Sequence, residues 1–269
     1  MLGSSLRAGF AMLALALLAG GGALRAQSVD PAGGKELAPT GHLRVGVYAG
    51  SPTSQVTDPE TKQNHGVTYD LGRELAVRLN VPVEYISFPK VADVVSAIRD
   101  GNVDFTVTNA TPVRARDVNF SQVLLMVELG YLVPANSPIT DPKQIDGPGI
   151  RIGVSRGGTS ERVLGEKFRN AKIISTESVP DAINSLRDGA FDVYATNKSI
   201  LFQMAQSLPG ARVLDGNWGA EHMAIAVPKG REAAQKLLDN FVRDVQSSGR
   251  LQQIETDAGL KGAVSAAKE

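Results

Sequence analysis

Hydrophobic positions along the chain are spaced either as in β-strands or as in amphipathic helices, and the order of these two patterns is repeated. Apolar residues suited to buried strands cover 43–48 and 81–88, and between them residues 68–79 have the spacing of an amphipathic helix. A strand at 151–154 and a segment at 156–161 that leads into a helix start a second series of the same kind. Repeated strand–helix–strand units favour a parallel sheet with helices on both faces. The pattern therefore predicts an α/β fold.

One eleven-residue segment of this pattern occurs twice. Residues 99–109 read RDGNVDFTVTN and residues 187–197 read RDGAFDVYATN, with six identical positions. In each copy a glycine ends an amphipathic helix, and a short apolar strand then ends at Thr-Asn. Ligands of open α/β sheets bind outside the carboxyl ends of the strands. We therefore predict two similar lobes whose Thr-Asn ends, at Asn109 and Asn197, face one small molecule.

Two extended apolar segments are suited to cross between these lobes. They cover residues 120–133 and 223–227. Their positions predict a first lobe made of residues 41–127 and 223–269, and a second lobe made of residues 128–222. The two crossing strands would then act as a hinge.

The N-terminal region has the pattern of an exported protein. Residues 1–26 combine a short basic segment, an apolar run and a small residue before position 27, which indicates a secretory signal peptide. The apolar run is short for a membrane span, so a membrane anchor is the less favoured alternative. Residues 27–40, rich in Gly, Pro and Ala, are predicted to be a disordered leader. An exported chain without cysteine or a later apolar span suits the periplasm.

Composition removes several classes of function. The 269 residues are 42% hydrophobic and 21% charged, as in soluble globular proteins, and the formal net charge is zero. This balance gives no reason to expect a nucleic-acid partner. The chain has no cysteine, and its three histidines are scattered. We therefore expect no thiol nucleophile, no metal site and no cofactor.

Arg114 is the strongest candidate for binding an anion. Thr111 is a suitable N-cap and is followed by Pro, so Arg114 is predicted to lie in the first turn of a helix that points into the cleft. A cation is unusual there, because the helix dipole is already positive. The arrangement makes sense if Arg114, free N–H groups and Asn109 bind one carboxylate together. The alternative is a surface salt bridge between Arg114 and Asp117.

Residues 41–260 resemble the solute-binding proteins of the polar amino acid uptake family of ABC importers. The matching motifs are GVTYDL at 66–71, TPVR at 111–114 with VNFS at 118–121, GTS at 158–160 and AIAVPKG at 224–230. The resemblance implies a type II periplasmic binding protein fold, whose two lobes close on the ligand. It also implies that Arg114 binds an α-carboxylate, with hydrogen bonds from Asn109, Thr159 and Ser160. We expect a monomeric, non-catalytic protein that delivers its ligand to the transmembrane subunits of an ABC permease.

Two positions depart from the pattern of this family. Members that bind α-amino acids usually have an aspartate for the ammonium where this chain has Asn197, followed by Lys198. The first loop has GSPT at 50–53, where an aromatic side chain commonly covers the ligand. We predict a small carboxylate-bearing solute, an amino acid or related organic acid, including solutes without a free ammonium or with a second acidic group. The predicted ligand contacts are Arg114, Thr108, Asn109, Thr159, Ser160, Asn197, Lys198, Tyr48, Ser51 and Thr53.

Two other functions remain open. Residues 157–161 are similar to the corresponding turn of periplasmic cyclohexadienyl dehydratases, which share the fold and use a glutamate there as general acid. Glu161 would take this role if burial raised its pKa. Glutamate is also a common capping residue at this helical position, and the chain lacks a matching aromatic-rich pocket. A sensor module that reports ligand state to a membrane receptor would use the same cleft.

Overall fold

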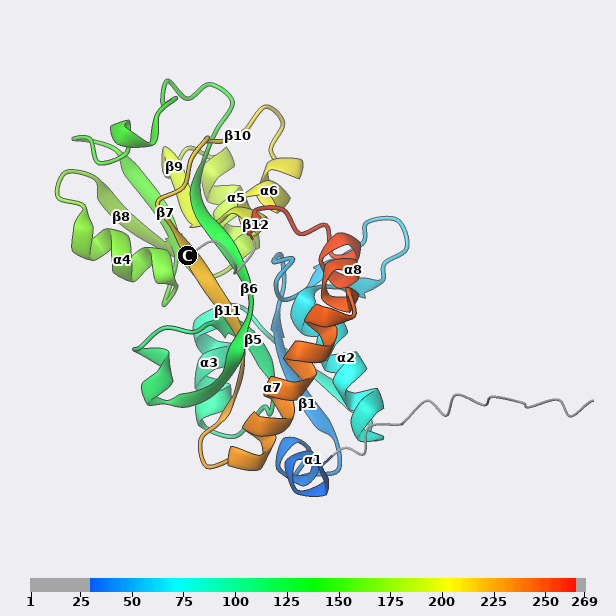
Figure 1. The fold of residues 1–269 in the computed structure, drawn as a ribbon. Helices are drawn as coiled ribbons and strands as arrows, with labels where there is room; N and C mark the ends of the chain where they lie inside the picture. Colours follow the sequence, from blue (N-terminus) through cyan, green and yellow to red (C-terminus); the bar gives the residue numbers. More distant parts are fainter. Residues whose placement is uncertain (1–29, 265–269) are drawn as a thin grey trace, which may run out of the picture.

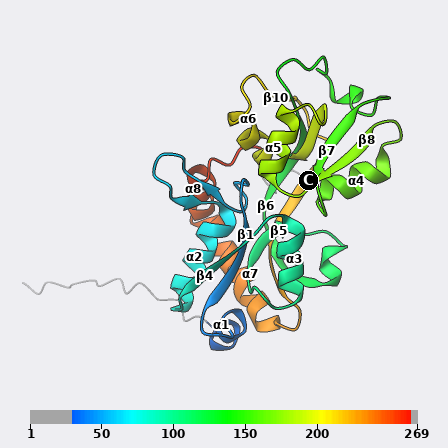
Figure 2. The same ribbon diagram turned by 180° about the vertical axis from the view of Figure 1, so that it is seen from behind.

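Two α/β lobes lie one above the other, and two long strands run between them (Figure 1). The computed structural model describes residues 30–264, and the predicted signal peptide lies outside them. The connecting strands are β6 (Val118–Val133) and β11 (Gly219–Pro228), which pair antiparallel along most of their length. Figure 2 shows the same two strands from behind. The predicted α/β fold with two lobes and two crossing strands is confirmed.

The first lobe, at the bottom of Figure 1, is built around strands that end at the gap between the lobes. β1 (Leu43–Tyr48) pairs in parallel with β4 (Val83–Phe88), and β5 (Thr106–Asn109) pairs antiparallel with β11. Ile225 and Ala226 are neighbours on β11 and belong to different hydrophobic clusters. The sheet therefore has helices on both faces. These helices are α2 (Val67–Leu79), α3 (Val91–Arg99), α7 (Glu232–Ser247) and α8 (Arg250–Asp257).

The second lobe repeats this arrangement. β7 (Arg151–Ser155) lies between β8 (Lys172–Thr176) and β9 (Val193–Asn197) with both pairings parallel, and β9 pairs antiparallel with the second half of β6. Val193 and Tyr194 alternate between two hydrophobic clusters, so this sheet is also covered on both faces. Its helices are α4 (Thr159–Lys167), α5 (Val179–Arg187) and α6 (Lys198–Gln206).

The remaining elements are short. They are α1 (Pro31–Leu37), β2 (Val56–Thr57), β3 (Asn64–His65), the 3-10 turns η1 (Arg114–Arg116) and η2 (Pro142–Gln144), β10 (Arg212–Val213) and β12 (Ala263–Val264). Within residues 30–264, no helix combines the length and the apolar character needed to cross a membrane.

The predicted disordered leader is wrong where α1 forms. Asp30 caps this helix by accepting the N–H of Ala32 at 3.1 Å, and Pro at the first helical position is pre-set for the turn. Leu37 is fully buried in the core of the first lobe. Gly33 packs so closely on α7 that a Cβ atom would meet a backbone oxygen at 2.7 Å. Packing against α7 thus outweighs the low helix propensity of the two glycines.

The repeated segment builds the same arginine–aspartate clamp in each lobe. Asp104 accepts hydrogen bonds from Arg44 Nε and Nη2 at 2.8 and 2.7 Å. Asp192 accepts the equivalent bonds from Arg151 at 3.1 and 2.7 Å. Each arginine lies at the start of its lobe's first strand, so the clamps brace the ends of β1 and β7 that are remote from the gap between the lobes.

Candidate ligand-binding site

A cleft between the lobes lies where the parallel strands end. It encloses about 570 Å³, including space open to solvent. The ends of β1 and β5 form one wall, the ends of β7 and β9 form the other, and the loops after β4 and β8 complete it. Its lining residues are Tyr48, Pro89, Lys90, Val91, Thr108, Asn109, Arg114, Ser155, Gly158, Thr159, Ser160, Glu177, Ser178, Val179, Thr196, Asn197, Ile200, Glu221 and Met223.

Arg114 lies in this cleft, on a single 3-10 turn rather than the helix expected there. Its backbone N–H donates to the Thr111 hydroxyl at 3.2 Å, so the predicted cap is present. Its Nη1 donates to Thr108 Oγ1 at 2.7 Å and to the carbonyl oxygen of Asn109 at 3.3 Å. Among residues 30–264 Arg114 forms no ion pair, and the alternative salt bridge with Asp117 is absent from that range.

The environment of Arg114 favours an anionic ligand group. Burial lowers the pKa of the guanidinium from its ordinary value, and the negative charge of Glu221 opposes this shift. An arginine side chain nevertheless stays protonated at neutral pH. A charge that is removed from water without a counter-ion raises the free energy of the site. Binding of a carboxylate would relieve that cost.

Asn109 connects the two lobes across the cleft. Its Nδ2 donates to Thr159 Oγ1 at 3.0 Å, and its Oδ1 accepts the backbone N–H of His222 at 2.9 Å. Thr159 is the first residue of α4, and the N-cap residue Gly158 has no side chain to cap the helix. The first N–H groups of α4 therefore lie at the cleft, where an anion is favoured.

Three of the residues predicted to contact the ligand are not among those that line the cleft. Ser51 and Thr53 are buried behind Tyr48, with their hydroxyls 2.9 Å apart, because the first loop folds back on itself. Burial raises the pKa of the Tyr48 hydroxyl, and the hydrogen bonds of this hydroxyl with Ser51 and Thr53 partly oppose that rise. Lys198 follows the end of β9, but its Nζ pairs with Glu128 of β6 at 2.6 Å.

Asn197 lines the cleft, as predicted, but its amide groups already have protein partners. Its Oδ1 accepts the Ile200 N–H at 3.1 Å and the Ser199 hydroxyl at 2.7 Å, and so caps α6. Its Nδ2 donates to Glu221 Oε2 at 2.8 Å. Asn197 therefore holds a carboxylate that comes from β11.

Glu221 is the most important cleft residue that sequence reasoning missed. It is 9% exposed and lies two residues before Met223, which also lines the cleft. Residues two apart on a strand share one face. The available signal was a charged residue beside a strand expected to cross the cleft. Lys90 and Glu177 were also missed. They follow the carboxyl ends of β4 and β8, and ligands of open α/β sheets bind outside such strand ends.

Residues 43–258 match the family described as bacterial extracellular solute-binding proteins, family 3. The chain belongs to this family. The ABC transporter glutamine-binding protein GlnH of Bacillus subtilis (strain 168) is 24% identical to this solute-binding protein over 201 residues, which are 73% of each chain. A solved solute receptor for L-cysteine of Neisseria gonorrhoeae has a TM-score of 0.75 and 26% identity, covering 84% of this chain and 92% of that one.

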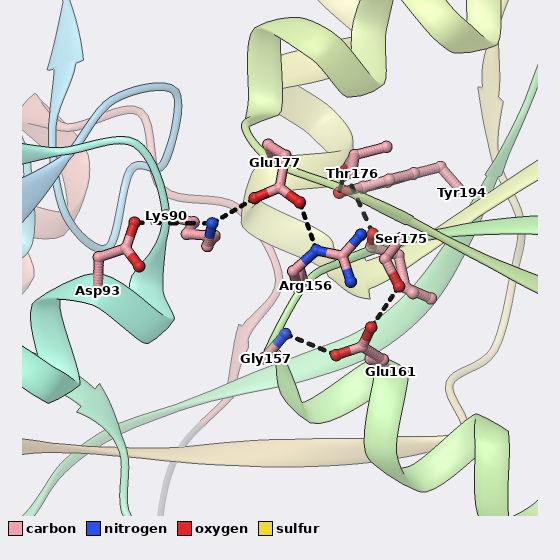
Figure 3. Close-up of polar contacts among 10 residues, drawn as sticks. Lys90, Asp93, Arg156, Gly157, Glu161, Ser175, Thr176, Glu177 and Tyr194 are labelled. Carbon is pink, nitrogen blue, oxygen red and sulfur yellow. Dashed lines mark hydrogen bonds and ion pairs between the residues drawn. The ribbon is translucent and has the colours of Figure 1, made fainter.

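A further solved structure bears on the dehydratase alternative. The ancestral amino acid-binding protein AncCDT-1, described as a precursor of cyclohexadienyl dehydratase, has a TM-score of 0.73 with 23% identity, covering 83% of this solute-binding protein and 98% of that chain. At this identity the likeness shows the fold alone. In the present chain Glu161 does not line the cleft: it accepts the Gly157 N–H at 2.6 Å and the Ser175 hydroxyl (Figure 3).

The mouth of the cleft is bridged by an ion triad, named here the interlobe ion bridge. Lys90 of the first lobe pairs with Glu177 of the second, and Glu177 also pairs with Arg156 (Figure 3). The hydrogen bond to Glu177 raises the pKa of Lys90, and the bonds from Lys90 and Arg156 lower the pKa of Glu177. Together with the bond between Asn109 and Thr159, this bridge joins the two lobes across the cleft.

We expect Glu177→Gln to shift the ligand-free protein modestly toward open forms. The triad is partly exposed, and exposed ion pairs contribute little and weaken with salt. Small-angle scattering should give a larger radius of gyration for the variant at low salt, with the difference vanishing at high salt. Because the pKa of Glu177 is lowered, its contribution is present above the ordinary carboxylate pKa and is lost as the pH falls through the lowered value.

The matched control is Glu166→Gln, which removes the partner of Arg162 within α4 and leaves the cleft unchanged. An unchanged radius of gyration in Glu177→Gln, measured beside this control at low salt, would show that the bridge does not influence closure.

Proposed function

We propose that this solute-binding protein captures a small carboxylate-bearing solute, an amino acid or related organic acid, in the periplasm and delivers it to the transmembrane subunits of an ABC permease. The observation that carries the proposal is the guanidinium of Arg114, which lies in the interlobe cleft without an ionic partner among residues 30–264. Relatives described as a glutamine-binding protein and an L-cysteine receptor support an amino acid as the solute.

Closure follows from having donors on both walls. Arg114 and Thr108 belong to the first lobe, whereas Thr159 and Ser160 at the start of α4 belong to the second. A carboxylate that contacts both walls binds the closed form more tightly than the open form and therefore shifts the population toward closure. Movement about β6 and β11 would reopen the cleft and release the solute to the permease.

Calorimetric titration of the purified protein tests this proposal. The panel consists of the standard L-amino acids and small organic acids, with neutral sugars as controls, and native mass spectrometry of protein taken from its host would detect a retained metabolite. We expect at least one carboxylate compound to bind with micromolar or tighter affinity and no sugar to bind. If every carboxylate compound fails to bind, the proposal is wrong.

The same preparation tests the two alternatives. Both oxygens of the Glu161 carboxylate accept hydrogen bonds within the second lobe, so we expect no turnover of prephenate or arogenate. Turnover that disappears in Glu161→Gln would replace the binding proposal with a dehydratase. A sensor role predicts that the protein binds the solute, but that a strain lacking the protein takes up this solute as well as the parent strain does.

A further inference from the structure

Glu221 places a negative charge in the wall of the cleft, and no lysine or arginine among residues 30–264 pairs with it. Its Oε2 accepts the hydrogen bond from Asn197 Nδ2 at 2.8 Å. Its Oε1 has no protein donor in that part of the chain. Because no buried side-chain oxygen or nitrogen in the described range lacks a partner, this Oε1 must be accessible to the cleft.

Asn197 fixes the direction of this carboxylate. Its Oδ1 is committed to the cap of α6 through Ile200 and Ser199, so its Nδ2 must be the group that faces Glu221. The amide therefore donates to one carboxylate oxygen and leaves the other for a ligand. Asn197 itself has no acceptor left for a protonated amine, and acts as a positioning residue for Glu221.

Arg114 and Glu221 are held on two sides of Asn109. The carbonyl oxygen of Asn109 accepts from Arg114 at 3.3 Å, and its side-chain Oδ1 accepts the N–H of His222, the neighbour of Glu221, at 2.9 Å. The two opposite charges are close enough for Glu221 to raise the pKa of Arg114 against the effect of burial. A ligand with only a carboxylate would satisfy Arg114 but leave Glu221 without a counter-charge.

We propose that Glu221, positioned by Asn197, binds the protonated amine of the ligand, so that the site selects zwitterionic α-amino acids over organic acids that lack an amine. This inference rests on the proposed function, in which Arg114 binds the carboxylate of the same ligand. The neutral amide of Asn197 is therefore compatible with a ligand that carries an ammonium group, because Glu221 of β11 supplies the carboxylate.

The test compares amino acids with their des-amino analogues. The full-length secreted protein is titrated with each standard L-amino acid, and the tightest ligand is then compared with the carboxylic acid in which hydrogen replaces its amine. We expect the unaltered protein to prefer the amino acid by about 100-fold, as for a desolvated charge pair. Glu221→Gln should lower affinity for the amino acid by about that factor and leave the des-amino analogue unaffected. Glu60→Gln, an exposed position with the same charge change, is the control.

A charge exchange tests the geometry of the pair. Asn197→Asp combined with Glu221→Gln exchanges the amide and the carboxylate between the two residues. In the unaltered protein, the Nδ2 atom of Asn197 and the Oε2 atom of Glu221 are 2.8 Å apart. Aspartate is as good an N-cap as asparagine, so α6 should persist. We expect the double variant to recover part of the preference for the amine that Glu221→Gln loses.

The outcomes separate this inference from the proposed function. If amino acids bind in a manner that depends on Arg114, but Glu221→Gln keeps the full preference for the amine, the inference is overturned and the proposed function stands. The same holds if the unaltered protein binds a des-amino acid as tightly as the amino acid, a comparison that needs no variant. If no carboxylate compound binds at all, both are overturned.

Discussion

Replacing Arg114 with methionine is expected to lower the affinity for the carboxylate ligand by at least about 100-fold. Only Nη1 has protein acceptors within residues 30–264, Thr108 and the carbonyl of Asn109, so the remaining N–H groups are available to a ligand. Each charge-assisted hydrogen bond to a carboxylate contributes about 1.5–3 kcal/mol. Isothermal titration with the ligand identified for the unaltered protein measures the loss.

Two further variants make this result specific. Arg116→Met removes the same charge from the same 3-10 turn, but Arg116 is exposed and does not line the cleft, so its affinity should be unchanged. Arg114→Lys keeps the charge and loses the planar pair of donors, and should bind with intermediate affinity. An Arg114→Met protein that binds as tightly as Arg116→Met would remove the central support for the proposed function.

Much of the fold could be predicted because local pattern and tertiary packing agree. The strand predicted at 43–48 is β1 to the residue, and the helix predicted at 68–79 is α2 except for its first residue, since their apolar periods match the faces that they bury. The chain after β11 forms two helices, α7 and α8, because Gly249 adopts a φ of +75° between them. α1 was missed because its stability comes from packing on α7 rather than from helix propensity.

The site was predictable where it depends on the ends of strands. Thr108, Asn109 and Asn197 line the cleft because β5 and β9 end there, as the repeat suggested. Glu221 was missed because the crossing strand was predicted to begin at 223, whereas β11 begins at Gly219. Where this strand begins depends on its pairing with β6, which the residue pattern does not identify. Once the strand includes Glu221, the two-residue alternation places Glu221 on the same face as Met223, which lines the cleft.

The repeated clamp gives the second large effect, and this effect should differ between the two lobes. Asp104 is 0% exposed and accepts from Arg44 and also from Arg231, at the start of α7. Asp104→Asn leaves two largely buried guanidinium groups without a counter-charge, so we expect a loss of about 3–5 kcal/mol in the free energy of unfolding. Urea denaturation followed by far-UV circular dichroism measures this change.

Asp192→Asn is the matched control, because it removes the same charge from the equivalent position of the second lobe. The Asp192 side chain is 34% exposed and accepts from Arg151 alone among the arginines of the described range. Solvent screens such a pair, so its loss should lower stability much less. If the two variants unfold at the same urea concentration, burial and the second arginine do not matter, and the clamps stabilise both lobes equally. The expected asymmetry follows because only the first clamp joins its strand to α7, the helix on which α1 also packs.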